Sequence, residues 1–385
     1  RDCVSCLVGS EMCIRDRPGM VILVVFVVSF LPRNELNDVF LEYFDETIPF
    51  RQATDFTVEN LTGMYLIDFS IESTETGGIS DPGFQQEVEN FANWFRQQPE
   101  TIHVNVFTDI MKRLNRNMHG DDDEMYRLPD DRNLAAQYLL MYEMSLPYGL
   151  DLNNQINVDK SATRMVVTLK TISTNNMLEL EKRSDQWIAE NTQHIKAASA
   201  SGPTMMFAHI GKRNIISMLG GTTIALVLIS LIMIVALRSF KLGLTSMVPN
   251  LVPAAMGFGI WGMLVGEVGL ALSVVTSMTL GIVVDDTVHY MSKYQRARVE
   301  KGYDSEQAVR YAFTSVGRAL VVTSVVLIAG FLVLAFSAFK LNSGMGLLTA
   351  LVIALALLAD FLLLPTLLMK IEDKSNEKNS TVTSA

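Results

Sequence analysis

The sequence has few cysteines and few charged residues. Among its 385 residues, cysteine occurs three times, at Cys3, Cys6 and Cys13, and no histidine lies near them to complete a four-ligand metal site. We therefore expect no disulfide framework, no metal and no cofactor. Charged residues make up 19% of the chain and the net charge is −10, which argues against nucleic acid as a partner, since nucleic acid requires a basic face.

Long apolar runs are missing from the first half of the chain and frequent in the second. Residues 33–210 contain no segment that could cross a bilayer, whereas residues 211–370 contain five. This asymmetry predicts a multi-pass α-helical membrane protein with an α+β extracytoplasmic domain at residues 33–210 and a five-helix transmembrane domain at residues 211–370. The lipid bilayer is then a partner of the second half.

Neither end of the chain has the composition of a packed core. Residues 1–17 resemble a translated sequencing-adapter scar, which would not be native protein. Residues 18–32 contain an apolar run, Met20 to Leu31, that is too short for a hydrocarbon core about 30 Å thick, and we interpret it as a truncated first transmembrane helix. Residues 371–385 are polar and are predicted to be a disordered cytoplasmic tail.

Within residues 33–210 the apolar residues follow both strand and helix periodicities. Strand spacing occurs at residues 65–71, 102–106 and 165–169, and helical spacing at residues 88–95 and 180–195. Such alternation predicts an α+β or split-βαβ domain. The acidic run His119 to Glu124 lacks the alternating ligands of a calcium loop, so we interpret it as a solvated loop. The apolar positions on which these predictions rest are Tyr65, Ile67, Phe69, Ile71, Val88, Phe91, Ala92, Phe95, Ile102, Val104 and Val106.

Basic residues set the predicted orientation of the five spans. Lys and Arg crowd residues 293–318, between the third and fourth spans, which places that connection in the cytoplasm and residues 33–210 outside it. Gly302 is expected to end one helix and Asp304, with Gln307, to cap the next. In the second span, Pro249, Pro253 and Gly257 indicate kinks and close helix packing.

The third span contains two adjacent carboxylates, Asp285 and Asp286. Burying one charge in a bilayer costs several kcal/mol, and a second like charge beside it makes full ionisation less favourable. We predict that one of them is the proton-coupling group. Gly281, four residues earlier, removes bulk where a partner helix could approach. The alternative is that the pair is solvated at a helix end.

Other polar residues lie at similar predicted depth. His289 follows one turn after the pair, Thr323 lies in the fourth span and Asp360 in the fifth, and we predict that they complete a proton relay. No Lys or Arg occurs at residues 319–339 or 344–369 to neutralise these acids. Protonation, or a cation from another polypeptide, must therefore offset their charge.

The order of one helix, a polar domain and five helices resembles one half of a resistance-nodulation-division (RND) transporter. The likeness is to the branch of the MMPL-type and hydrophobe/amphiphile exporters, with the Patched-like proteins, and covers Pro18 to Met369. The segments that carry it are Pro49-Phe-Arg51, Leu146 to Gly149, Pro249 to Pro253, Gly281 to His289, and Asp360 to Pro365.

The resemblance implies a function and partners. It implies a secondary active transporter, not an enzyme, in the cytoplasmic (inner) membrane, which uses the proton-motive force to export hydrophobic or amphiphilic molecules such as lipid-like compounds or drugs. Family members carry two halves, and this chain resembles the C-terminal one. The expected partners are then an apolar or amphiphilic substrate, protons, and the missing N-terminal half or a second copy.

Two other functions remain open. A sterol- or lipid-sensing receptor shares the same helical fold. An intramembrane aspartyl protease also needs two Asp on separate spans, as Asp285 and Asp360 would provide, although Val283 and Leu364 to Thr366 depart from the expected protease motifs.

Overall fold

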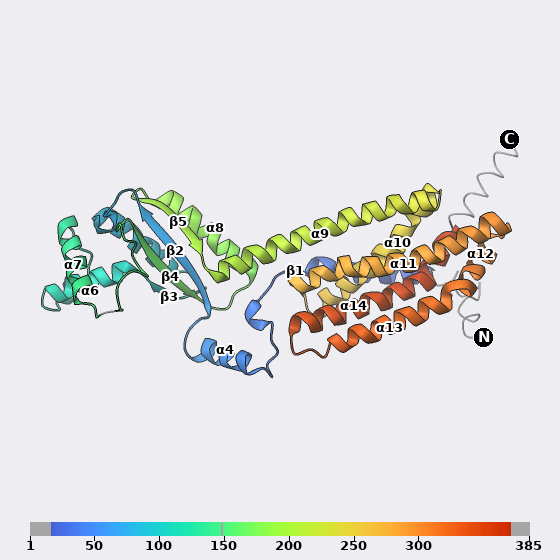
Figure 1. Ribbon diagram of the computed structural model, residues 1–385, viewed down its shortest axis with the longest axis horizontal. Coiled ribbons are helices and arrows are strands. Elements are labelled where there is room, and N and C mark those ends of the chain that lie inside the picture. Colours follow the sequence, from blue (N-terminus) through green and yellow to red (C-terminus); the bar gives the residue numbers. More distant parts are fainter. Residues whose placement is uncertain (1–16, 148, 371–385) are drawn as a thin grey trace. The chain divides into compact units, whose positions relative to one another are not determined.

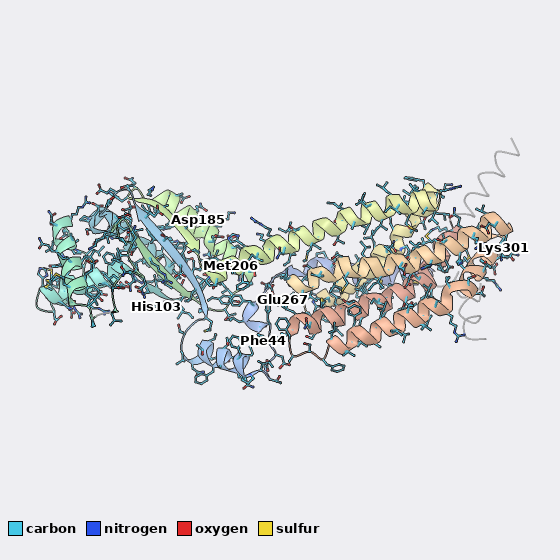
Figure 2. All side chains as sticks on the ribbon, viewed as in Figure 1. Phe44, His103, Asp185, Met206, Glu267 and Lys301 are labelled. Carbon is cyan, nitrogen blue, oxygen red and sulfur yellow. The ribbon has the colours of Figure 1, made fainter. Side chains whose placement is uncertain are left out.

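The computed structural model describes residues 17–147 and 149–370 (Figure 1). The predicted scar, apart from Arg17, and the predicted tail lie outside the described residues. The chain divides into two compact units. Among the described residues, the polar domain consists of residues 39–42 and 46–212, and the membrane domain consists of residues 17–38, 43–45 and 213–370. Figure 2 labels side chains in each, such as His103 in the polar domain and Lys301 in the membrane domain.

The polar domain is built on a four-stranded antiparallel sheet. The strands are β2 (Tyr65–Ser73), β3 (Thr101–Asn105), β4 (Ala162–Leu169) and β5 (Ile195–Ser201), in the order β3-β4-β2-β5. Helix α5 (Pro82–Arg96) follows β2 and helix α8 (Thr174–Asn191) follows β4. This is the topology of a split βαβ fold, so the α+β prediction is confirmed.

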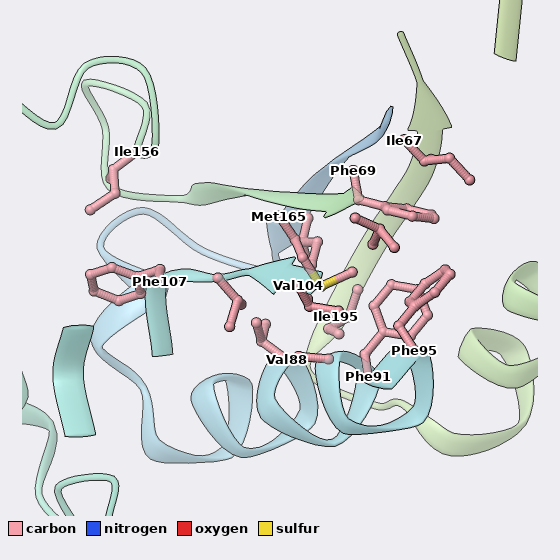
Figure 3. Close-up of a cluster of buried hydrophobic side chains, with 14 of the residues drawn as sticks. Ile67, Phe69, Val88, Phe91, Phe95, Val104, Phe107, Ile156, Met165 and Ile195 are labelled. Carbon is pink, nitrogen blue, oxygen red and sulfur yellow. The ribbon is translucent and has the colours of Figure 1, made fainter. Parts of the chain in front are cut away.

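The core of the polar domain lies between the sheet and α5 (Figure 3). Alternate residues of β2 are buried, from Tyr65 at 2% exposed to Ile67 and Phe69 at 0%. The helical face of α5 opposes them, and Phe69 meets Phe91 edge to face with ring centroids 5.2 Å apart. The predicted periodicities therefore identify the core faces of both elements.

The strand predicted around Ile102 and Val104 is present as β3, but Ile102 itself lies outside the core. Ile102 is 45% exposed, whereas Val104 and Val106 are each 1% exposed. The register between β3 and β4 shifts between Thr101 and His103, and such an irregularity turns the following side chains to the other face. The acidic run lies on the surface as expected, and its Asp122 side chain caps the short 3-10 helix Asp123–Met125.

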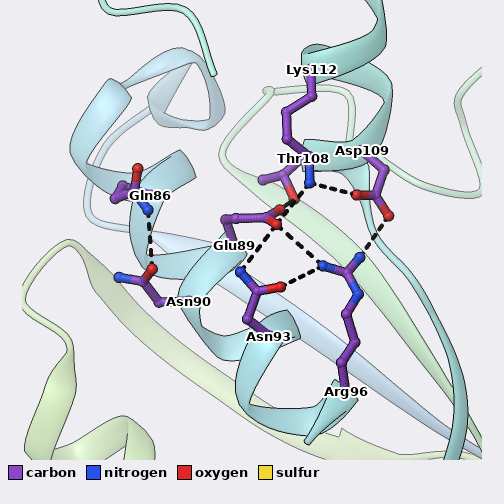
Figure 4. A network of polar contacts seen from close by, with 8 residues as sticks. All are labelled: Gln86, Glu89, Asn90, Asn93, Arg96, Thr108, Asp109 and Lys112. Atoms are coloured by element: carbon purple, nitrogen blue, oxygen red, sulfur yellow. Dashed lines mark hydrogen bonds and ion pairs between the residues drawn. The ribbon is translucent and has the colours of Figure 1, made fainter. Parts of the chain in front are cut away.

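Further helices extend the polar domain: α4 (Pro49–Asn60), α6 (Phe107–Met118) and α7 (Arg132–Ser145). A polar network joins α5 to α6 (Figure 4). Glu89 of α5, 8% exposed, accepts hydrogen bonds from Thr108 and from Lys112 Nζ at 2.7 Å. The two neighbouring cations, Arg96 and Lys112, offset the buried charge of Glu89.

The membrane domain contains, among the described residues, five helices long and apolar enough to cross a bilayer. They are α9 (Pro203–Ala236), α10 (Phe240–Leu264), α11 (Leu270–Lys301), α12 (Ser305–Ala312) continuing into α13 (Arg318–Leu334), and α14 (Lys340–Leu358) with the turns that follow it. The shorter apolar helix α3 (Arg17–Val28) packs on α10, where Gly259 lies against the carbonyl oxygen of Val27. The prediction of a multi-pass helical membrane protein with an additional α+β domain is confirmed.

The boundary between the two units differs from the expected one. Strand β1 (Glu35–Leu36) pairs in parallel with β6 (Glu267–Val268), between α10 and α11. Asp38 accepts a hydrogen bond from Tyr43 at 2.7 Å. Residues 33–38 therefore pack with the membrane helices rather than with the polar domain.

The basic segment after the third span is largely helical. Helix α11 continues to Lys301 and ends at Gly302, whose φ of +66° is a left-handed conformation that glycine adopts without strain. Asp304 and Gln307 form the predicted capping box at the start of α12. A π-helical turn, Phe313–Gly317 (η5), joins α12 to α13 without a break.

Candidate functional site

Three buried polar side chains from three helices meet inside the membrane domain. Thr287 of α11 donates to Asn250 Oδ1 of α10 at 2.8 Å, and its hydroxyl lies 3.4 Å from Asp360 Oδ1 in the turn that follows α14. Thr287 is 0% exposed, Asp360 1% and Asn250 5%. This Asn250-Thr287-Asp360 cluster ties α10, α11 and α14 together away from solvent and lipid.

A π-helical turn, Ala359–Leu363 (η6), positions Asp360. The N–H of Leu364 donates to the carbonyl of Ala359, five residues earlier. Pro365 has no N–H, so it cannot close the α-helical bond to Phe361, and its ring would crowd that carbonyl. The motif Asp360 to Pro365 thus contains both the acid and the residue that disturbs the helix around it.

The hydroxyl of Thr287 has one proton and three nearby acceptors. Besides Asn250 and Asp360, it lies 3.1 Å from the carbonyl oxygen of Val283 on its own helix. The hydroxyl lies 2.8 Å from Asn250 Oδ1 and 3.4 Å from Asp360 Oδ1, so its hydrogen bond to Asn250 is the stronger of the two. In this arrangement the Thr287 hydroxyl donates its hydrogen bond to Asn250.

Asp286 lies beside this cluster, half-buried between α11 and α13. Its carboxylate is hydrogen-bonded to Ser324 of α13, which is 1% exposed. Within the described residues, neither Asp286 nor Asp360 forms an ion pair with Lys or Arg, and Asp360 Oδ2 has no hydrogen-bond partner. The two acids therefore lie in an environment that provides hydroxyl groups but, within the described part of the chain, no lysine or arginine.

Comparison with known proteins gives a family for this arrangement. The MMPL family matches residues 90–378, which is more than half of the chain. This chain belongs to the MMPL family. A membrane protein of Methanocaldococcus jannaschii, MJ1562, is 28% identical over 148 residues, which make up 38% of the chain and 38% of that protein.

Other predicted site residues of this MMPL protein face outward. Asp285 and His289 form a pair 3.5 Å apart on the outer face of α11, with side chains 73% and 62% exposed. Gly281 lies on the same stripe, and no heavy atom of another described segment comes within 4 Å of where its Cβ would stand. The close helix approach expected at Gly281 is therefore not made within the described part of the chain.

Thr323 also lies outside the site. Its side chain is exposed and bonds only to carbonyl oxygens of its own helix, those of Ala319 and Leu320. The next residue, Ser324, faces the interior instead. Asn250 was not predicted either, although a signal was present: it is an amide side chain between two prolines of an apolar span.

The small and kinked residues of α10 do lie at helix contacts. Pro249 and Pro253 are buried within a continuous helix. At Gly257, a Cβ would stand 2.5 Å from Val352 Cγ2 of α14, so glycine permits the close approach of these two helices. This contact holds α10 and α14 together one to two turns from Asn250.

Proposed function

We propose that this MMPL protein exports apolar or amphiphilic molecules across the cytoplasmic membrane using the proton-motive force, with Asp360 and Asp286 as proton carriers. The family comprises transporters, which fits a protein that is not an enzyme. One observation carries the proposal. Asp360 is 1% exposed within a membrane span, and its nearest hydrogen-bond donor is a hydroxyl whose single proton has another acceptor.

The energetic argument concerns the charge of a buried acid. An ionised Asp at the centre of a membrane helix costs roughly 2.5–3.5 kcal/mol on insertion scales, whereas a protonated one avoids most of this cost. We expect an acidic side chain at such an unfavourable position where the gain and loss of its proton serve the function of the protein. Asp286, half-buried and closer to the outer face of α11, provides a second carrier on the path.

Protonation of Asp360 would change which helices are bonded. With Asp360 neutral, Thr287 donates to Asn250 at 2.8 Å and joins α10 to α11. With Asp360 ionised, the same hydroxyl turns to the carboxylate and Asn250 loses its donor. Each proton that arrives or leaves thereby shifts the balance between two arrangements of α10, α11 and α14, as alternating access requires.

A second polypeptide is part of this proposal. The stripe Gly281, Asp285 and His289 exposes charged groups along a membrane helix, where contact with lipid is unfavourable. A second copy of this chain, or another polypeptide segment, would cover it. Cross-linking through Gly281→Cys in a variant with Cys3, Cys6 and Cys13 replaced by serine should give a dimer, whereas Val325→Cys, on an exposed face of α13, should not.

The proposal is tested with purified protein in phospholipid vesicles under an imposed pH gradient. A fluorescent amphiphile serves as the transported probe. Asp360→Asn and Asp286→Asn should each abolish gradient-driven movement, while Asp285→Asn should retain most of it. This ranking differs from the sequence-based prediction, in which Asp285 or Asp286 is the proton-coupling group and Asp360 only completes the relay. Movement that survives Asp286→Asn and Asp360→Asn, singly and together, would refute proton coupling and favour a lipid-sensing receptor.

The geometry gives little support to the protease alternative. Asp285 points away from the helix bundle, with 73% of its side chain exposed, while Asp360 is buried within it. An aspartyl protease requires two carboxyl groups that share a proton at close distance.

A further inference from the structure

Two π-helical turns of neighbouring helices contact each other in the membrane domain. The ring of Phe313, the first residue of η5, lies against the ring of Phe361 in η6, with the two centroids 5.0 Å apart. At the other end of η5, a Cβ on Gly317 would stand 3.9 Å from Phe361 Cζ. The ring of Phe361 therefore lies close to both ends of η5.

This contact joins a buried acid to a helix that is distant from it in the sequence. π-Helical turns are rare and often mark functional sites. Here η6 contains Asp360, and η5 joins α12 to α13. The two turns thus connect Asp360 to α12 through one pair of rings.

A third ring, that of Tyr290 in α11, holds Phe313 in place. It meets the ring of Phe313 edge to face with centroids 5.0 Å apart, and the two residues are 0% and 4% exposed. Tyr290 lies three residues after Thr287, so the three rings lie one helical turn from the cluster that contains Asp360. Protein interiors are close-packed, so a buried ring moves only when its neighbours move.

The backbone of η6 links the ring of Phe361 to the carboxyl group of Asp360. The two residues are consecutive within this turn. Any change of the turn that withdraws Asp360 from Thr287 therefore also moves the ring of Phe361. That ring lies against Phe313, which Tyr290 holds, so η6 changes only together with η5.

Helix α12 is the element that moves with η5. It continues into η5 without a break, and its buried face packs in the same apolar cluster as Tyr290 and Phe313. At its other end, the short connection at residues 302–304 joins it to α11. Displacement of η5 is therefore transmitted to α12, which lies at the end of the helix bundle where α11 ends (Figure 1).

We infer that Phe313 is a positioning residue for Asp360: its ring interlocks η5 with η6, so that the positions of Asp360 and of α12 change together. The coupling is reciprocal, so whatever fixes α12 in one position also fixes Asp360. The interlock stands on the contacts of the two turns, and its importance for proton-driven transport rests on the proposed function. Helix α12 is then the segment through which transport is controlled from outside the bundle interior.

The coupling from η6 to α12 is measured by hydrogen–deuterium exchange of the purified chain in detergent, with mass spectrometry of residues 305–312. Pro365→Ala supplies the N–H that η6 lacks and removes the ring that disturbs the helix there. We expect this substitution to change the exchange rate of α12 at least fivefold, at the lower end of typical couplings between sites. Pro253→Ala, which replaces a buried proline of α10, is the matched control and should change that rate less than twofold.

Phe313→Ala separates positioning from packing. A ring that only fills space would leave the effect of Pro365→Ala on α12 unchanged when it is removed. We expect instead that Pro365→Ala, added to Phe313→Ala, changes the exchange rate of α12 less than twofold. Phe313→Leu keeps an apolar contact with Phe361 and should restore at least half of the response.

The reverse coupling is measured at Asp360 by infrared spectroscopy, from the carboxyl or carboxylate band that disappears in Asp360→Asn. Asp304→Ala removes the exposed cap of α12, whose carboxylate accepts a hydrogen bond from the Gln307 N–H at 2.7 Å. We expect Asp304→Ala to shift the maximum of this band in the unmodified chain but not in Phe313→Ala. Asp131→Ala, which removes the same kind of cap from α7 in the polar domain, should leave the band in place.

Either an α12 exchange rate that Pro365→Ala leaves unchanged or a band that Asp304→Ala leaves in place would overturn the interlock, because the coupling is reciprocal. If Pro365→Ala does not fold, Asp304→Ala decides alone, since Asp304 lies on the surface. Neither measurement uses transport or a pH gradient. Absence of coupling in a protein whose transport still depends on Asp360 would refute this inference alone, and coupling without such transport would refute only the proposed function.

Discussion

Replacement of Thr287 by valine removes one oxygen atom from the centre of the membrane domain and keeps the shape of the side chain. In the structure that oxygen donates to Asn250 at 2.8 Å and lies 3.4 Å from Asp360. A buried acceptor left without a donor costs about 1–3 kcal/mol, but hydrogen bonds between membrane helices average only about 0.6 kcal/mol. We therefore expect Thr287→Val to lower the free energy of unfolding by about 1–2 kcal/mol.

The effect on transport should be larger than this loss of stability alone would cause. Valine can donate to neither acceptor, so the charge of Asp360 no longer changes the bond between α10 and α11. We expect gradient-driven movement of the amphiphile to fall at least tenfold, which corresponds to about 1.4 kcal/mol in a rate-limiting barrier. The assay is the vesicle experiment described above, with unfolding in detergent measured in parallel.

Thr323→Val is the matched control, because Thr323 is exposed and bonds only within its own helix. It should change neither stability nor transport. A Thr287→Val protein that moves the amphiphile at the unmodified rate would show that the hydroxyl does not link protonation to helix arrangement.

Three further predictions concern packing, pH and topology. Gly257→Ala should destabilise the membrane domain by about 1–3 kcal/mol, because its Cβ would stand 2.5 Å from Val352 Cγ2. Gly330→Ala on the exposed face of α13, where no heavy atom lies within 4 Å of the added Cβ, should not; thermal unfolding in detergent compares them. Burial alone would raise the pKa of Glu87, but hydrogen bonds from His194 and from three backbone N–H groups outweigh burial and lower that pKa from its ordinary 4.5. The hydrogen bond to Glu87 in turn raises the pKa of His194 above 6.5. Their stabilisation should therefore be complete between about pH 4.5 and 6.5 and decline as the pH falls below or rises above this window, and Glu87→Gln should flatten the profile in hydrogen exchange of the polar domain. An impermeant thiol reagent on intact cells should label Asp122→Cys and not Lys301→Cys, and the reverse pattern would overturn the predicted orientation.

The polar domain was largely predictable because each of its strands and helices has one face in the core and the opposite face in water. Alternation in β2 and helical spacing in α5 contrast apolar with polar residues, and this contrast identifies the buried faces correctly. The exposed Ile102 could not be predicted, since the irregular register between β3 and β4 depends on strand pairing and not on the composition of β3.

The membrane helices offered no such contrast. Hydropathy predicts where they occur, but lipid and protein interior are both apolar, so sequence gives little indication of which face is buried. Neighbouring residues of a helix point about 100° apart, and the site differs from the prediction by such single steps. Ser324 rather than Thr323 faces inward, and Asp286 rather than Asp285. Pro365 was the one local signal that placed Asp360 in a disturbed turn.

The π-helical turn η6 also determines how Asp360 could leave the interior. A π turn holds one more residue than an α turn, and this extra residue can pass to the neighbouring turn while the two ends of the helix stay in place. The residues between the old and new positions then rotate by about 100° around the helix axis. Pro365 has no N–H to donate to Phe361, so a regular α-helix in place of the turn would lack that hydrogen bond, and migration is favoured toward Ala356. Asp360 can therefore exchange one environment for another by axial rotation of a single turn, without any sliding of α14 along its neighbours.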